Sequence, residues 1–95
     1  LIMLKTEFIV SGNSVDDLAT ELELLYKKWY TNPSETTGKR RRKKLTLRII
    51  ITDITCETSV EHCIRYACSE IRDGIVSAGG TIWDGTHVQI MRDET

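Results

Sequence analysis

Residues 14–30 carry the pattern that most limits how this chain can fold. Apolar side chains recur there at steps of three and four positions, and charged side chains occupy most of the other positions. This spacing predicts an α-helix with one apolar stripe, which has to be buried against another element. Ser14 is a favourable N-cap with Asp17 three residues later, and Pro33 follows the predicted end. The stripe consists of Val15, Leu18, Ala19, Leu22, Leu25, Tyr26 and Trp29.

A second apolar stripe predicts a helix over residues 59–78. We expect Thr58 or Ser59 to cap its start and Gly79 to follow its last turn. Gly74 lies inside this range, where glycine costs roughly 1 kcal/mol relative to alanine, but the apolar period continues past it. The predicted stripe consists of Val60, Ile64, Ala67, Ile71, Ile75 and Ala78.

Residues 1–10 and 45–52 alternate between two kinds of side chain, which is typical of strands with one buried face. The other face of the second strand is mixed, so we expect that side of the sheet to be partly exposed to water. The side chains predicted to face the core are Leu4, Thr6, Phe8, Val10, Leu45, Leu47, Ile49 and Ile51.

Residues 81–92 are predicted to form one strand or a hairpin. Asp84-Gly85 is a strong signal for a two-residue hairpin turn. Such a turn would pair Thr81 with Val88 and place Trp83 on the face that carries Val88 and Ile90. A looser turn would change this register.

These elements predict an α+β fold in the order β-α-β-α-β(-β). We expect a two-layer sandwich of ferredoxin-like character, with two helices on one face of a three- or four-stranded sheet. The one-sided pattern favours a mixed or antiparallel sheet. A chain of 95 residues has the size of a single domain. No apolar run reaches the ~18–20 residues of a membrane span, so we expect no membrane partner.

The polar segment 31–44 contains the densest charge of the chain, and it is long for a loop within a domain. We expect a flexible basic loop here. Its last six residues are all basic, whereas the other seven basic residues face 14 acidic ones, so the rest of the chain carries −7. Such a patch attracts polyanions locally although the whole chain is nearly neutral.

We expect this loop to bind nucleic acid through phosphates, without strong sequence preference. Flexible cations supply charge but no rigid donor geometry for reading bases. Arg48 is expected to join the loop from the next strand, and Tyr30 to stack on bases. Trp29 continues the apolar stripe and is expected in the core. The predicted binding residues are Tyr30, Lys39, Arg40, Arg41, Arg42, Lys43, Lys44 and Arg48.

Other interpretations of the basic segment are an acidic protein partner, a solvated linker or a targeting signal. The chain also fits a protein–protein interaction or inhibitor module of a phage-like mobile genetic element, or an oligomeric structural protein. We expect a homodimer, because the outer face of the sheet carries apolar side chains that a second copy could bury. These are Ile9, Ile50, Ile54 and Met91.

Catalysis, metal binding and cofactors are not expected. Cys56 precedes a predicted helix and His87 could approach it, but no orienting acid or oxyanion hole accompanies them. The other potential metal ligands, His62, Cys63 and Cys68, lack the Cys-x-x-Cys spacing of common zinc sites. An odd number of cysteines argues against a secreted disulfide framework, so we expect a reducing, cytoplasmic compartment.

Overall fold

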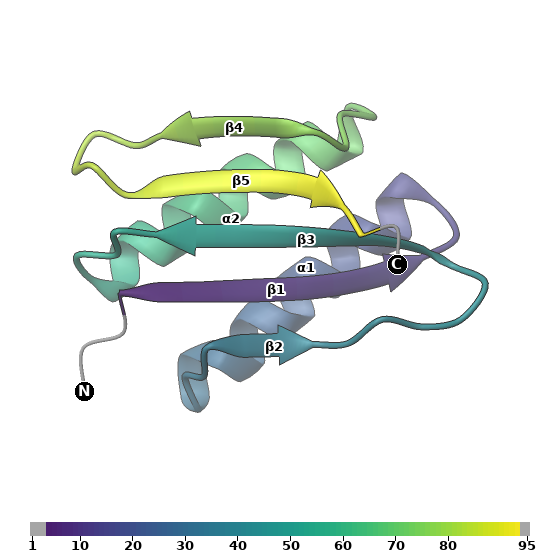
Figure 1. Cartoon of the computed structure of the whole chain (residues 1–95), viewed down its shortest axis with the longest axis horizontal. Helices are drawn as coiled ribbons and strands as arrows, with labels where there is room; N and C mark the ends of the chain where they lie inside the picture. The colour runs from purple at the N-terminus through teal and green to yellow at the C-terminus, as the bar shows by residue number, and fades with distance from the viewer. Residues whose placement is uncertain (1–3, 94–95) are drawn as a thin grey trace.

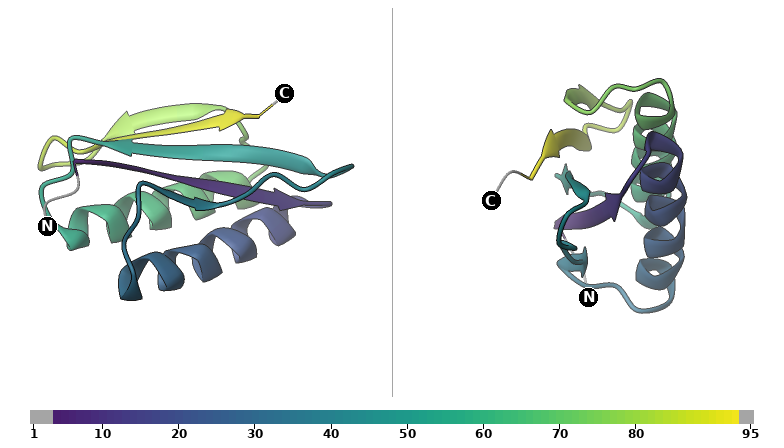
Figure 2. Two further views of the ribbon diagram at one scale, coloured as in Figure 1. Left: turned by 60° about the horizontal axis from the view of Figure 1, so that its bottom comes forward. Right: turned by 90° about the vertical axis from the view of Figure 1, so that its right-hand side faces the viewer.

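The computed structural model describes residues 4–93 and arranges seven regular elements in two layers (Figure 1). The first layer is a five-stranded sheet, and helices α1 and α2 cover one of its faces (Figure 2). The predicted two-layer α+β sandwich is confirmed. The strands are β1 (Lys5–Gly12), β2 (Thr36–Gly38), β3 (Leu45–Thr52), β4 (Ala78–Thr81) and β5 (His87–Arg92). The helices are α1 (Val15–Thr31) and α2 (Glu57–Arg72).

The sheet is mixed, and its strand order is β2-β1-β3-β5-β4. β1 and β2 are parallel, whereas the other neighbours are antiparallel. The prediction of three or four strands is wrong, because β2 forms within the segment that the sequence presents as a polar linker. β2 has only three residues, Thr-Thr-Gly, which are too few to show a period. Of the predicted first strand, residues 1–3 lie outside the described residues.

The core lies between the sheet and the two helices. Ser14 caps α1 as predicted, since its hydroxyl oxygen accepts a hydrogen bond from the Asp17 amide at 3.1 Å. Trp29 is buried, with its ring edge-on to Phe8 at 6.3 Å between centroids. Two residues expected to face the core are exposed here: Leu4, which precedes β1, and Ile75 of the predicted second stripe, which follows the end of α2. The largest fully buried apolar side chains are Phe8, Val10, Leu18, Leu22, Leu47, Ile49, Ile51, Val60, Ile71 and Ile90.

Helix α2 is shorter than the predicted 59–78 and is displaced toward the N-terminus. Cys56, rather than Thr58 or Ser59, occupies the N-cap. At the other end, Gly74 has a φ of +87°, a backbone conformation that residues with a side chain rarely adopt. The Ile75 amide donates to the Glu70 carbonyl at 2.9 Å. This is a Schellman motif. The apolar period therefore continues past Gly74 in the sequence while the backbone has already left the helix.

The C-terminal segment is a hairpin, and its turn is looser than the tight turn predicted at Asp84-Gly85. The Gly85 amide donates to the Ile82 carbonyl at 3.0 Å, and the Ile82 amide donates to the Thr86 carbonyl at 2.9 Å. Gly85 has a φ of +93°, as three-residue hairpin loops require. The register is thereby shifted by one residue, and Trp83 lies at the loop tip, 80% exposed. Its predicted place beside Val88 and Ile90 is wrong.

The hairpin loop is fastened to the start of α2 through Asp84. The carboxylate of Asp84 accepts hydrogen bonds from the hydroxyls of Ser59 and Thr55, the latter at 2.6 Å, and from the Thr86 amide at 3.0 Å. These donors, Ser59 first, hold the pKa of Asp84 well below its usual range.

The lowered pKa of Asp84 predicts an acid-dependent loss of stability. The ionised carboxylate stabilises the fold fully above the ordinary carboxyl pKa of about 4, and this contribution is lost as the pH falls further. Replacement of Asp84 by Asn should lower the free energy of unfolding at pH 6 and flatten its decline between pH 5 and pH 2.5. Urea unfolding across this range measures both effects.

Asp73→Asn is the matched control, because the side chain of Asp73 accepts no hydrogen bond from any residue in the described range. If Asp84→Asn and the unmodified protein lose stability with the same pH profile, the hydrogen-bonded carboxylate is not the group that titrates.

Candidate functional site

The basic run forms the loop between β2 and β3, here called the basic loop (residues 39–44), at one end of the sheet (Figure 1). β1 lies between β2 and β3 in the sheet, so the basic loop has to pass the end of β1 to reach β3. It also reverses direction, because β2 is parallel to β1 and β3 is antiparallel to it. Lys43 has a φ of +61° within this reversal.

Two arginines of the basic loop hold it against the rest of the molecule. The backbone amide of Arg41 donates to the hydroxyl oxygen of Ser11 at 3.1 Å, and its guanidinium pairs with Glu21 of α1 at 3.1 Å. The guanidinium of Arg40 donates to the carbonyl oxygen of Asp93 at 2.6 Å. The loop is thus connected to β1, to α1 and to the end of β5.

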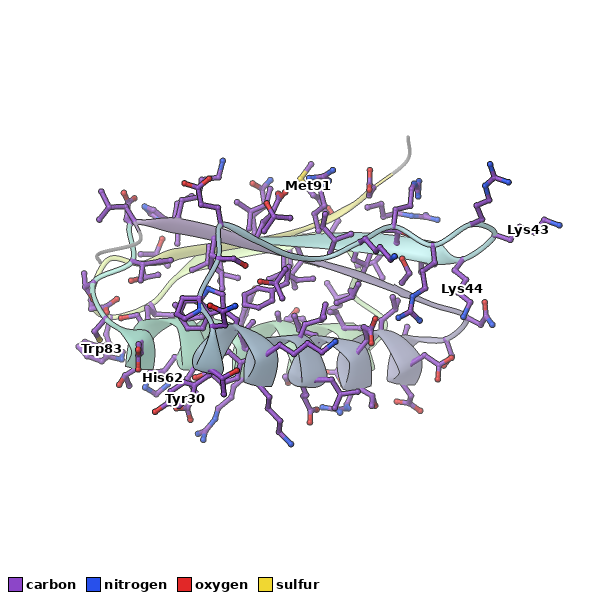
Figure 3. The ribbon with its side chains drawn as sticks, turned by 90° about the horizontal axis from the view of Figure 1, so that it is seen from below. Tyr30, Lys43, Lys44, His62, Trp83 and Met91 are labelled. Atoms are coloured by element: carbon purple, nitrogen blue, oxygen red, sulfur yellow. The ribbon has the colours of Figure 1, made fainter. Side chains whose placement is uncertain are left out.

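The other four cations of the basic loop face solvent. Lys39, Arg42, Lys43 and Lys44 are exposed, and none of their side chains makes an ion pair or hydrogen bond within residues 4–93. Lys43 and Lys44 lie at one extreme of the molecule (Figure 3). Three consecutive cations and Lys39, all without carboxylate partners among the described residues, produce a local positive potential that a polyanion can relieve.

Of the remaining two predicted binding residues, Arg48 adjoins the basic loop, since it and Arg40 both contact Asp93, whereas Tyr30 lies far from it. Arg48 lies on β3, where both oxygens of Glu7 accept from it at 2.9 and 3.1 Å and Asp93 lies 3.7 Å away. Tyr30 is exposed at the opposite end of the molecule from Lys43 (Figure 3). The reason is that α1, with 17 residues, carries the chain about 25 Å back along the sheet before β2 begins.

A groove of about 610 Å³ lies between α1 and β2, here called the α1–β2 groove. It adjoins the basic loop and contains two lysines from the last turns of α1, Lys27 and Lys28. A role in a groove could not be predicted for them, since β2, the opposite wall, has no sequence signal of its own. The lining residues are Glu21, Leu24, Leu25, Lys27 and Lys28 of α1, Thr37 and Gly38 of β2, and Lys39 and Arg41 of the basic loop.

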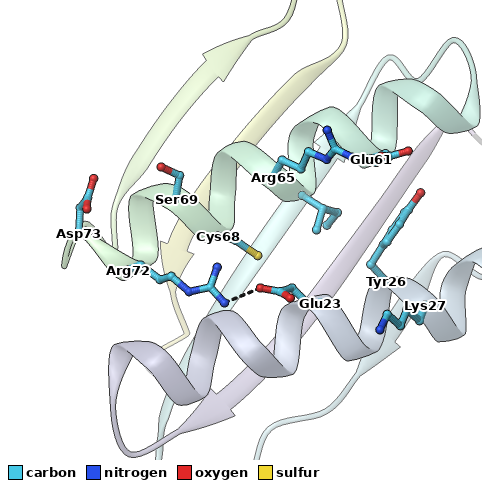
Figure 4. Close-up of a pocket in the computed structure, with 10 residues that line it drawn as sticks. Glu23, Tyr26, Lys27, Glu61, Arg65, Cys68, Ser69, Arg72 and Asp73 are labelled. Carbon is cyan, nitrogen blue, oxygen red and sulfur yellow. Dashed lines mark hydrogen bonds and ion pairs between the residues drawn. The ribbon is translucent and has the colours of Figure 1, made fainter.

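A second groove, of about 680 Å³, lies between the two helices and is here called the interhelical groove (Figure 4). Its cations are largely neutralised, since Arg65 pairs with Glu61 at 2.7 Å and Arg72 pairs with Glu23. Burial raises the pKa of the Cys68 thiol beside it to about 11, so this thiol stays protonated near neutral pH. The charged side chains that line the groove are Glu23, Lys27, Glu61, Arg65, Arg72 and Asp73.

Cys56 and His87 have separate surroundings. Cys56 is exposed at the start of α2, and a hydrogen bond with Ser59 lowers the pKa of its thiol. His87 contacts Thr81 at 2.6 Å through Nδ1 and Asp53 at 3.4 Å through Nε2. Among the described residues, no three His, Cys, Asp or Glu side chains converge as a metal site would require.

The sheet face opposite the helices carries three of the four apolar residues expected there. Ile9 and Ile50 are half-buried and Met91 is 37% exposed. Ile54 is wrongly placed by the prediction, because it follows β3 and is buried in the core. The Glu7–Arg48 ion pair lies among these residues, since Glu7 is opposite Ile50 and Arg48 is opposite both Ile9 and Met91 in the sheet. The apolar surface is therefore interrupted by charge.

No helix within residues 4–93 combines the length and apolarity needed to cross a bilayer.

No protein-family model matches this chain. No curated protein matches it in sequence, and no solved structure matches it. Its function therefore has to be inferred from the geometry and charge of its own residues.

Proposed function

We propose that this chain is a small non-catalytic protein that binds nucleic acid through its phosphates at the basic loop. One observation carries the proposal: Lys39, Arg42, Lys43 and Lys44 are exposed without acidic partners, among the described residues, on a loop that its neighbours hold in place. Holding the loop keeps these cations together at one end of the molecule, so a ligand finds them already gathered.

A polyanion is the ligand that this arrangement favours. Adjacent cations repel one another in the free protein, and phosphates relieve that repulsion while their own counterions are released. The rest of the chain carries a net charge of −7, which disfavours contact with a polyanion elsewhere. Contact is thereby directed to the basic loop.

The same arrangement favours binding without strong sequence preference. Base readout requires side chains that are fixed against base edges, whereas Arg42, Lys43 and Lys44 project into solvent. The exposed aromatic residues that could stack on bases, Tyr30 and Trp83, lie at the opposite end of the molecule (Figure 3).

The test is the triple replacement of Arg42, Lys43 and Lys44 by alanine. Arg40 and Arg41 are left in place because they connect the loop to the rest of the fold. We expect weaker binding to all sequences alike, and a slope of log K against log salt that is smaller by up to about 3. Fluorescence anisotropy with mixed-sequence single- and double-stranded DNA and RNA, at several salt concentrations, measures both quantities.

A matched control removes three cations that belong neither to the basic loop nor to the α1–β2 groove, Lys5, Arg65 and Arg72, and so changes the net charge equally. This control should retain most of the salt slope. The proposal is wrong if the unmodified protein shows no binding at low salt and micromolar concentration. It is also wrong if the two triple variants lose equal affinity.

The alternative proposal is an interaction or inhibitor module that recognises a protein partner by shape, as a phage-like element could encode. It predicts little salt dependence and no binding to mixed DNA or RNA.

Self-association through the face that carries Ile50 is a separate prediction. Sedimentation of the unmodified protein and of Ile50→Glu tests it, because the substitution places a charge where the two copies would meet.

A further inference from the structure

The α1–β2 groove continues the surface of the basic loop along the side of the molecule. Lys39 and Arg41 belong to the loop and also line the groove, and Lys27 and Lys28 add two cations from the last turns of α1. A ligand that is bound at the loop therefore meets further positive charge along α1.

The charge of the α1–β2 groove is unbalanced, which distinguishes it from the other groove on α1. Its four cations face a single carboxylate, Glu21, which already pairs with Arg41, so the lining carries a net charge of +3. The interhelical groove has a similar size, but three cations there, including Lys27, which borders both grooves, face three carboxylates and the net charge is zero. Of these two grooves, only the α1–β2 groove attracts an anion.

The wall formed by β2 is open to a ligand. β2 is the edge strand of the sheet, and no other strand of residues 4–93 pairs with its outer side. Leu24 lies in the groove and is 50% exposed, so it offers an apolar contact among the cations. No aromatic side chain of the described chain lines the groove, which leaves phosphate and sugar as the parts of a nucleic acid that it can contact.

We propose that the α1–β2 groove holds the phosphodiester backbone of a nucleic acid that is bound at the basic loop, with Lys27 and Lys28 on its phosphates. This inference rests on the proposed function. From Glu21 to Lys28 the axis of α1 advances about 10 Å. This length accommodates a short stretch of backbone beyond the loop, with one phosphate at each of the two lysines.

The experiment compares two double variants that remove equal charge. Lys27→Ala/Lys28→Ala removes two cations of the α1–β2 groove, and Arg65→Ala/Arg72→Ala removes the two cations that line only the neutral interhelical groove. The probes are a mixed-sequence single-stranded DNA 20-mer and the duplex of the same sequence. We expect the lysine variant to reduce the salt slope by about 2, because each lysine neutralises one phosphate. The arginine variant should leave the slope unchanged.

The outcomes separate this inference from the proposed function. Equal slopes for the two double variants, with binding still weakened and its slope still reduced in the Arg42/Lys43/Lys44 variant, would overturn the groove and leave the loop as the site. Absence of binding by the unmodified protein would overturn both. A reduced slope with the single strand alone assigns the groove to unpaired strands, and a reduction with both probes assigns it to either form. Circular dichroism checks that the exposed replacements retain the fold.

Discussion

Replacing Leu22 with alanine should lower the free energy of unfolding by about 2–5 kcal/mol. Leu22 is completely buried in the middle of α1, within the core between the helices and the sheet. Its truncation removes apolar contacts and leaves a cavity that close-packed neighbours can fill only in part. Urea unfolding followed by circular dichroism measures the loss.

Leu24→Ala is the matched control for this prediction. Leu24 belongs to the same helix and has the same side chain, but it is 50% exposed. Its replacement should change the free energy of unfolding by less than about 0.5 kcal/mol. Equal losses at the two positions would mean that α1 does not present the Leu22 side to the core.

The long elements were predictable because their sequences repeat the same pattern over many residues. The stripe of α1 covers four turns, and its cap at Ser14 agrees with the stripe. β3 alternates over residues 45–52, and the observed strand has the same bounds. Where several local signals agree over such a length, the local structure is rarely changed by tertiary contacts.

The errors occur where a single backbone position decides the outcome. Gly74 ends α2 although the apolar period continues to Ile75, because a φ of +87° is open to glycine and closes the Schellman motif. The positive φ of Gly85 allows a hairpin loop that is one residue longer than predicted. The strand register changes by one residue, and Trp83 is exposed to solvent. Periodicity carries no information about either event.

β2 was not predictable because contacts from elsewhere in the chain specify it. The Glu7 amide donates to the Glu35 carbonyl at 2.8 Å, and the Thr6 hydroxyl donates to the Ser34 carbonyl at 2.8 Å. These contacts bring a polar segment beside β1 that has no strand pattern of its own.

The candidate site was predictable only in part, because contacts from elsewhere in the chain also decide which of its cations are free to bind. The cations of the basic loop are adjacent in the sequence and are visible at once. Which of the predicted binding residues are engaged depends on the fold, because Glu21 reaches Arg41 from α1 and Glu7 reaches Arg48 from a neighbouring strand. The contribution of Lys28 depends on β2 as the opposite wall of the groove, so it became visible only with the structure.

Replacing Gly38 with alanine should destabilise the fold by about 2–4 kcal/mol, from positive-φ strain and from overpacking. Gly38 has a φ of +92°, and a Cβ atom there would lie 2.2 Å from the carbonyl oxygen of Ile9 and 2.6 Å from Cδ1 of Leu25. The first of these neighbours is the backbone of β1, so β2 itself has to move. Urea unfolding measures the cost.

Gly85→Ala separates the two causes. Gly85 has almost the same φ, +93°, but no other part of the described chain lies within 4 Å of the position that a Cβ would take. Its replacement should therefore cost only the strain of the positive φ, about 1–2 kcal/mol. A Gly38→Ala variant that loses no more than Gly85→Ala would show that β2 is not packed between β1 and α1.

The same pair of variants connects the packing of β2 with binding. Gly38 immediately precedes Lys39, so a displaced β2 moves this lysine and the wall of the α1–β2 groove together. Gly38→Ala should accordingly reduce the salt slope of nucleic-acid binding under conditions where the variant is still folded, whereas Gly85→Ala should not. A folded Gly38→Ala protein with an unchanged slope would mean that binding depends on the exposed cations of the basic loop alone, irrespective of where β2 holds them.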